Sequence, residues 1–261
     1  MPAFNLPSGS TVVVPTDEGD VRRLTRKGFE SFNSAVLGLG DIKTPSVSKP
    51  AIAAYFDLQG FTFFCKQIEP HFFVPVYLGA FLDWIFKSIR EETAWETEDE
   101  YVQLYHPLPF FTKFMGDGIL VLWDTTNMHP TSQHTVIQSC RNIVIEYEIS
   151  FLPTMRRKVV DPPPMLRCGI AKGTVYSVGN GEDFVGSCIN FSARLQKFAN
   201  LPIAFSRRGF EPEAVWPAEI LANWVLKQIS IRGIGENELV YVHKEDFEML
   251  SEHDKKLFRV P

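Results

Sequence analysis

Two aspartates in this chain lie beside glycines at the ends of apolar runs. Asp57 ends the run that opens AIAAYFDLQGFT (51–62), and Asp117 lies between two glycines in FFTKFMGDGILVLWD (110–124). A carboxylate at the end of a buried strand, followed by a loop with exposed N–H groups, can hold a hard cation and cradle phosphates. Both aspartates are therefore candidate metal ligands. Taken alone, Asp57 is more simply interpreted as a turn residue or helix cap, so the assignment depends on the rest of the chain.

A third motif passes from a glycine-rich loop into a predicted helix. Within GNGEDFVGSCINFSARLQKFA (179–199), Asn190 and Arg194 lie four residues apart. Residues at this spacing share one face of a helix, so both side chains can act on one ligand. Ordinary surface polarity would explain either residue by itself.

Together, DLQGFT, KFMGDG and DFVGSCINFSAR resemble the motifs of class III nucleotide cyclase catalytic domains in order and in internal spacing. The resemblance covers about residues 51–243. It implies that two divalent ions, Mn²⁺ or Mg²⁺, are held by Asp57, Leu58 and Asp117, where they grip a nucleoside triphosphate and activate its ribose 3′-hydroxyl. It also implies that Asn190 positions the ribose and that Arg194 neutralises charge at the reacting phosphorus.

The resemblance assigns further residues to the phosphates. The loop amides of Gly60, Phe61 and Thr62 are expected to contact them. The family places a lysine in a KG dipeptide before the last pair of strands, and Arg232 stands there in this chain. Arginine keeps the positive charge, but its planar guanidinium carries several N–H donors where lysine has one compact ammonium, so the geometry of this contact changes.

Base choice in the family rests on two residues that correspond to Lys113 and Asp183. Lysine donates to a ring nitrogen and aspartate accepts from an exocyclic amine. Adenine and cytosine both present that edge, whereas guanine and uracil reverse it. The aromatic residues near the motifs are either core residues or walls of a narrow base pocket; these are Phe56, Phe61, Phe63, Phe64, Phe110 and Phe111.

Three functional readings remain open. Because we expect no sensor, receiver, receptor or membrane domain in this chain, it resembles the stand-alone pyrimidine cyclases of bacterial antiphage systems, which make cyclic UMP or cyclic CMP. The alternatives are an adenylate cyclase and a cyclase-like module that only binds nucleotide. Family dimers are head-to-tail with shared active sites, and this chain carries both complements, so the resemblance implies a homodimer.

The predicted elements alternate between strands and helices, which indicates an α/β (α+β) sandwich with a largely antiparallel sheet. By resemblance the sheet is of the ferredoxin-like βαββαβ type, flanked by helices. Residues 1–50 are predicted to be an N-terminal extension and linker, and 51–261 the cyclase domain with a C-terminal helix. The sequence predicts helices over 18–38, 74–89 and 132–152, a further helix that ends near 226, and a solvated acidic helix end over 91–100. It predicts strands over 51–56 and 202–206 and hairpins over 110–124 and 165–179. A final pair of strands is predicted over 227–233 and 238–244.

Composition limits the surroundings of the protein. It is 45% hydrophobic with a net charge of -5 and no sustained basic run, which argues against nucleic acid or an anionic membrane as partner. Its four cysteines show neither zinc-ligand nor disulfide spacing and fit a reducing cytoplasm. The N-terminus lacks the features of a signal peptide. His71–Ile85 is the most membrane-like segment, but we expect it to be too short to span a bilayer and to form a buried helix.

Overall fold

The computed structural model describes residues 11–16, 19–96 and 101–261. The chain divides into two compact units, one of residues 1–48 with 176–185 and the other of residues 49–175 with 186–261. Within the described part of the first unit lie β1 (Thr11–Thr16), β2 (Gly19–Leu24), α1 (Arg26–Glu30), a 3₁₀ turn (Ser34–Leu37) and β9 (Asp183–Val185). The helix predicted over 18–38 is therefore wrong, because a strand occupies its first part.

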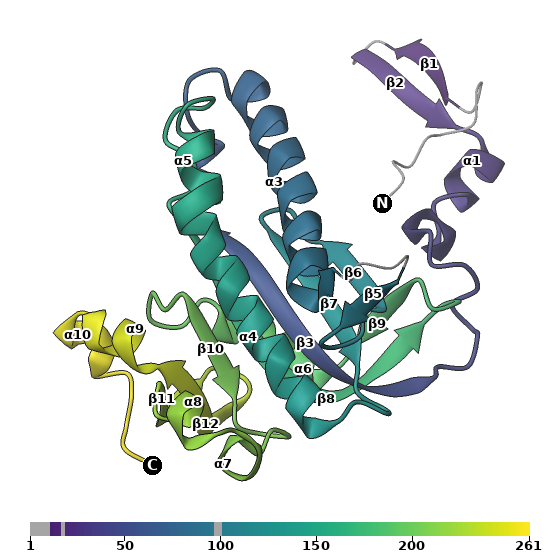
Figure 1. Ribbon diagram of the computed structural model, residues 1–261. Helices are drawn as coiled ribbons and strands as arrows, with labels where there is room; N and C mark the ends of the chain where they lie inside the picture. Colours follow the sequence, from purple (N-terminus) through teal and green to yellow (C-terminus); the bar gives the residue numbers. More distant parts are fainter. Residues whose placement is uncertain (1–10, 17–18, 97–100) are drawn as a thin grey trace. The chain divides into compact units, whose positions relative to one another are not determined.

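The second unit is built on a sheet with the strand order β11-β12-β10-β8-β3-β7-β6 (Figure 1). The strands are β3 (Ser48–Gln59), β6 (Phe111–Phe114), β7 (Gly118–Asp124), β8 (Met165–Val178), β10 (Ile203–Ser206), β11 (Trp224–Ile231) and β12 (Gly235–His243). The β8–β10 pair is parallel, while β3–β7, β6–β7, β10–β12 and β11–β12 are antiparallel. The predicted α+β fold with a largely antiparallel sheet is confirmed.

Helices flank this sheet, and a separate hairpin follows the longest of them. The helices are α2 (Phe61–Phe64), α3 (Pro70–Thr93), α4 (Pro130–Glu146) with a π-helical turn (Tyr147–Phe151), α5 (Leu152–Met155), α6 (Ser187–Leu195), α7 (Pro212–Val215), α8 (Ala218–Leu221), α9 (Lys244–Met249) and α10 (Glu252–Lys255). The acidic segment predicted as a helix end runs from α3 into β4 (Ala94–Glu96), which pairs with β5 (Val102–Leu104). Its last residues, 97–100, lie outside the described chain.

Side chains on one face of the central strands form the core beneath α3 and α4. In β3 the even-numbered residues Ile52, Ala54, Phe56 and Leu58 are buried there, together with Tyr77, Phe81 and Ile85 of α3. Because successive side chains of a strand point to opposite faces, the odd-numbered residues of β3 face the other side. This alternation decides which side of the sheet carries Asp57.

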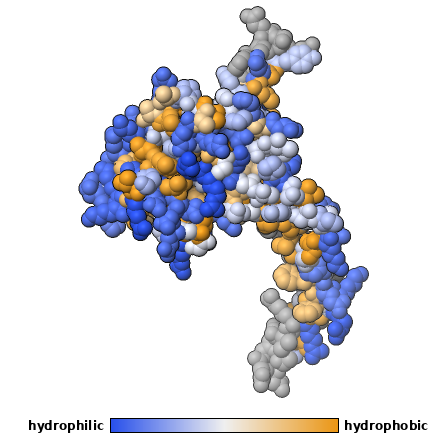
Figure 2. All heavy atoms as spheres, turned by 90° about the horizontal axis from the view of Figure 1, so that it is seen from below, coloured by the Kyte–Doolittle hydropathy of each residue, from blue (hydrophilic) through white to orange (hydrophobic). Residues whose placement is uncertain are grey.

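Helix α3 is longer than predicted. It has 24 residues and a mean hydropathy of 1.4 in its most apolar window, so by length and composition it could cross a membrane. It also supplies core side chains, and a single helix of this kind is weak evidence for a membrane span because core helices pass the same test. Phe72, Val76 and Phe86 on α3 are exposed. Figure 2 shows hydrophobic patches among hydrophilic side chains on one face of the molecule.

Two further predictions of local structure are wrong. Residues 165–179 do not form a hairpin, because Met165–Val178 is one continuous strand. No helix ends near residue 226, because Trp224–Ile231 is a strand, preceded by the two short helices α7 and α8. The predicted hairpin at 110–124, the helix over 74–89 and the last pair of strands are confirmed.

Candidate active site

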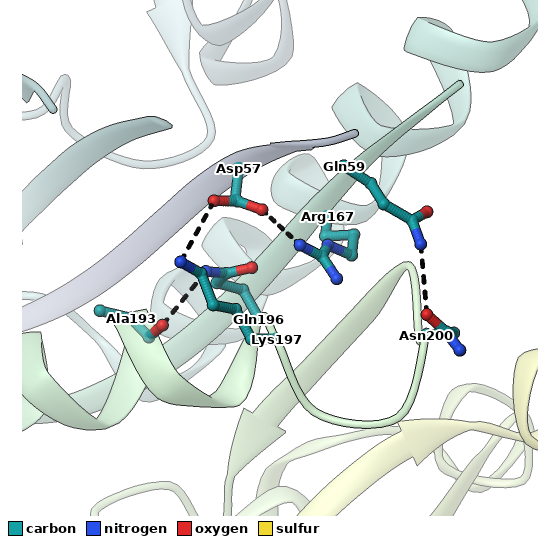
Figure 3. Close-up of polar contacts among 7 residues, drawn as sticks. All are labelled: Asp57, Gln59, Arg167, Ala193, Gln196, Lys197 and Asn200. Carbon is teal, nitrogen blue, oxygen red and sulfur yellow. Dashed lines mark hydrogen bonds and ion pairs between the residues drawn. The ribbon is translucent and has the colours of Figure 1, made fainter. Parts of the chain in front are cut away.

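Asp57 lies on the sheet face opposite α3 and α4, where it meets two cationic side chains. Arg167, on β8, donates from Nη2 to Asp57 Oδ2 at 2.5 Å, and Lys197, just beyond α6, places Nζ 4.0 Å from Asp57 Oδ1 (Figure 3). The side chains of Asp57 and Arg167 are only 3% and 12% exposed. The two chain neighbours of Arg167, Leu166 and Cys168, point into the core, so strand alternation directs Arg167 to the opposite face, which is the face of Asp57.

Asp117 is brought beside Asp57 by the pairing of β3 with β7. Asp57 pairs with Gly118, and the Leu58 N–H donates to the Asp117 carbonyl at 2.9 Å. Gly118 allows this close approach, because a Cβ there would lie 2.6 Å from the Phe56 carbonyl oxygen. Whereas Asp57 is buried, Asp117 is half-buried. The structure therefore brings the two predicted metal ligands together at the end of one strand pair.

The charges of both aspartates act on a neighbouring tyrosine. Burial raises the pKa of Tyr55 above its usual value, and the negative charges of Asp117 and Asp57 raise it further. Burial also raises the pKa of the Cys65 thiol, again with a contribution from Asp117. Two carboxylates at the end of the β3–β7 strand pair can together stabilise a divalent cation.

The donor set fits a hard divalent ion that shares its coordination with a substrate. Asp57 Oδ1 is buried, and no hydrogen bond from the described residues reaches it. The described part of the chain holds no cluster of three or more His, Cys, Asp or Glu side chains that could bind a metal ion. Mg²⁺ is typically bound through one or two carboxylates with phosphate oxygens and water completing the shell, which matches Asp57 and Asp117 beside the backbone of Leu58.

The predicted phosphate loop follows directly. Gly60 has φ of +79°, a conformation that favours glycine, and α2 starts at Phe61. The N–H groups of Phe63 and Phe64 donate back to the Gly60 carbonyl. The first N–H groups of a helix have no intrahelical acceptor, so those of Phe61 and Thr62 suit the predicted contact with phosphate oxygens. That contact remains a prediction.

Helix α6 is held against the sheet by a glycine on β8. A Cβ on Gly169 would lie 2.2 Å from the Ser192 carbonyl oxygen and 2.5 Å from the Gln196 nitrogen, so only glycine admits the helix at this distance. The packing places Arg194 at the surface beside the β11–β12 turn. There Gly233, with φ of +75°, leaves room for the Arg194 guanidinium, whose Nη1 would lie 2.5 Å from a Cβ.

Arg194 and Arg232 line one pocket of about 740 Å³, together with Lys197. All three charged residues that line it are cationic, so it suits an anion with several charges. Asn190 instead lines a neighbouring pocket of about 230 Å³ with Lys172 and Arg208. Gly233 borders both pockets, so the structure places Asn190 and Arg194 on adjacent pockets.

The two predicted base-reading residues belong to different units of the chain. Lys113 is half-buried on β6, opposite Leu120 of β7, in the second unit. Asp183 lies on β9 in the first unit, where its Oδ1 accepts from the Phe184 N–H. Of the aromatic residues considered for a base pocket, Phe56 and Phe64 are core residues with exposures of 0% and 1%, whereas Phe63 is 70% exposed.

Sequence reasoning missed Arg167 and Lys197. The only signal for Arg167 was a charged residue within the apolar strand MLRCGIA, where alternation would place it opposite the core side chains. Lys197 gave no local signal beyond its position three residues after Arg194, because its contact with Asp57 joins segments 140 residues apart.

No protein-family model and no curated protein matches the chain. Among solved structures, it is similar to a bacterial light-regulated adenylyl cyclase, with a TM-score of 0.50 and 14% identity over 89% of this chain; it spans only 64% of that chain. It is also similar to the catalytic core of a rhodopsin-guanylyl cyclase with converted specificity in complex with ATPαS, with a TM-score of 0.50 and 14% identity over 77% of this chain and 98% of that one. The mixed α+β fold matches that of cyclase catalytic domains.

Proposed function

We propose that this protein is a nucleotide cyclase that converts a nucleoside triphosphate to a 3′,5′-cyclic monophosphate and pyrophosphate. One observation carries the proposal: β3 and β7 bring Asp57 and Asp117 together, and the chain also forms a pocket whose charged lining residues, Arg194, Lys197 and Arg232, are all cationic. A pair of carboxylates beside a cationic pocket is what binding a metal–triphosphate complex requires. The cyclase fold of the solved neighbours supports the same conclusion.

In the proposed reaction, the ribose 3′-oxygen attacks the α-phosphorus, loses its proton, and the bond from that phosphorus to the bridging oxygen of pyrophosphate breaks. Asp57, Leu58 and Asp117 would hold two divalent cations, Mn²⁺ or Mg²⁺, which when bound favour the 3′-alkoxide and neutralise phosphate charge. Asn190 would orient the ribose. Arg194 would stabilise the charge that develops at the α-phosphorus, and Arg232 the departing phosphates.

We further propose a pyrimidine substrate and a role as an antiphage second-messenger synthase in the cytoplasm. Support comes from the resemblance to the bacterial pyrimidine cyclases and from the residue types at the two base-reading positions of that family, a donor, Lys113, and an acceptor, Asp183, which match the N3/N4 edge of cytosine. Adenine offers the same order of acceptor and donor, so an adenylate cyclase is the second candidate function. Neither nucleic acid nor a membrane is a proposed partner.

A product assay tests both the activity and the base. With ATP, GTP, CTP and UTP supplied in parallel with Mn²⁺, we expect a cyclic pyrimidine nucleotide to be the main product by mass spectrometry, and excess chelator to abolish it. A dominant cyclic AMP product would replace the pyrimidine proposal with the adenylate cyclase. Binding of nucleotide without any cyclic product would identify a module that only binds.

We also propose a homodimer with shared sites, in which the aspartates of one protomer work with Asn190 and Arg194 of the other. Homodimers of Asp117→Ala and homodimers of Asn190→Ala should each be inactive, because both shared sites of the dimer then lack the same essential side chain. After subunit exchange, mixed dimers carry one intact site, so we expect partial recovery of turnover. Sedimentation and a labelled-subunit exchange assay verify mixing; verified exchange without recovery would contradict shared sites.

A further inference from the structure

Lys197 is a charged residue of the site to which the reaction described above gives no role. It lies just beyond the end of α6, and its side chain is 62% exposed. Its ammonium nitrogen nevertheless approaches the buried Asp57 carboxylate to 4.0 Å, as Figure 3 shows. At this distance the two groups form an ion pair but no hydrogen bond, so the contact is a loose one.

The two oxygens of Asp57 have different partners. Oδ2 accepts the short hydrogen bond from Arg167, which is itself nearly buried. Oδ1 has the Lys197 ammonium as its cationic neighbour, and no described residue donates a hydrogen bond to it. Oδ1 is therefore the oxygen with a lone pair to offer a metal ion, and Lys197 stands on that side of the carboxylate.

Lys197 also lines the pocket of Arg194 and Arg232. A flexible lysine side chain can turn from one anion to another nearby, because its ammonium is a point charge on four methylene groups. The same side chain can thus serve the Asp57 carboxylate or an anion that binds beside it. A bound triphosphate would offer the ammonium several charged oxygens close to its present position.

We propose that Lys197 neutralises Asp57 in the nucleotide-free protein and moves to the triphosphate when the metal–triphosphate complex binds. This inference rests on the proposed function. Arg167 keeps Oδ2 in both states, so Asp57 remains oriented while Oδ1 exchanges an ammonium for a metal ion. Lys197 consequently competes with a free metal ion but assists the metal–triphosphate complex, and its removal should shift the two affinities in opposite directions.

The test uses Lys197→Met, which keeps the length of the side chain and removes its charge. Mn²⁺ binding is measured by electron paramagnetic resonance without nucleotide, and binding of the Mn²⁺ complex of inorganic tripolyphosphate by calorimetry. We expect Mn²⁺ alone to bind severalfold more tightly and the tripolyphosphate complex about tenfold more weakly, the loss typical of one charged hydrogen bond. Lys197→Arg should retain the affinity for tripolyphosphate, and Lys256→Met, at an exposed lysine after α10, should change neither value.

Unchanged binding of both probes to Lys197→Met, or shifts in the same direction, would overturn the inference. An equal effect of Lys256→Met would also overturn it, because the effect would then be one of net charge. Tripolyphosphate carries no base or ribose, so the result does not depend on which nucleotide is cyclised. If Lys197→Met shows these binding shifts but the wild-type protein forms no cyclic product from any nucleoside triphosphate, the proposed function is refuted and the role of Lys197 in binding still holds.

Discussion

Replacing Asp117 with alanine should lower turnover by about a thousandfold or more and leave the stability of the fold nearly unchanged. The carboxylate is one of two that would hold the divalent cations, so the variant loses transition-state stabilisation worth several kcal/mol. The side chain is only half-buried, and the hydrogen bond from Leu58 reaches the Asp117 backbone carbonyl, which the substitution keeps. We therefore expect a change of at most about 0.5 kcal/mol in the free energy of unfolding.

Steady-state kinetics in Mn²⁺ and urea unfolding would measure both quantities on the same preparation. Asp124→Ala is the matched control, because Asp124 ends the same strand β7 far from Gly118 and pairs with Lys49 at 2.9 Å. This control should retain turnover. Near-normal activity of Asp117→Ala would remove Asp117 from the metal site and, with it, the two-carboxylate basis of the proposed reaction.

Asp57→Ala is expected to abolish turnover and also to destabilise the protein by about 3 kcal/mol, because it leaves a buried arginine without its partner. The Arg167 side chain is 12% exposed and donates to Asp57 at 2.5 Å. Its Nε is buried, and no hydrogen-bond partner for it is found among the described residues. Removal of the carboxylate thus leaves a nearly buried positive charge without its partner, whereas the Asp117 carboxylate is only half-buried.

The double variant Asp57→Ala/Arg167→Met separates the two effects of this substitution. Methionine removes the stranded charge and retains apolar bulk, so most of the lost stability should return while turnover stays absent. Urea unfolding of the wild type, both single variants and the double variant gives the coupling energy of the pair. Additive losses in stability would show that Asp57 and Arg167 do not depend on each other.

The sequence by itself determined several local elements and the candidate residues on them. A continuous apolar run identifies β3, and glycines around Asp117 identify the turn between β6 and β7, because a short apolar run and turn chemistry are both read from a few neighbouring residues. The same local logic identifies Asp57, Asp117, Asn190 and Arg194 as candidates. It fails at Gly173, predicted to be part of a hairpin turn, where a Cβ would lie 3.2 Å from Cys188 Cβ: glycine serves close packing of α6 against a continuous strand.

Only the tertiary structure decided which charges meet. Strand order brings Arg167 of β8 to Asp57 of β3, and the packing of α6 against Gly169 brings Lys197 to the same carboxylate. It also separates Asn190 and Arg194 onto adjacent pockets, although helical spacing puts them on one face. The two contacts of Asp57 join residues more than a hundred positions apart, and their partners are selected by strand order and helix packing, which no short stretch of sequence encodes.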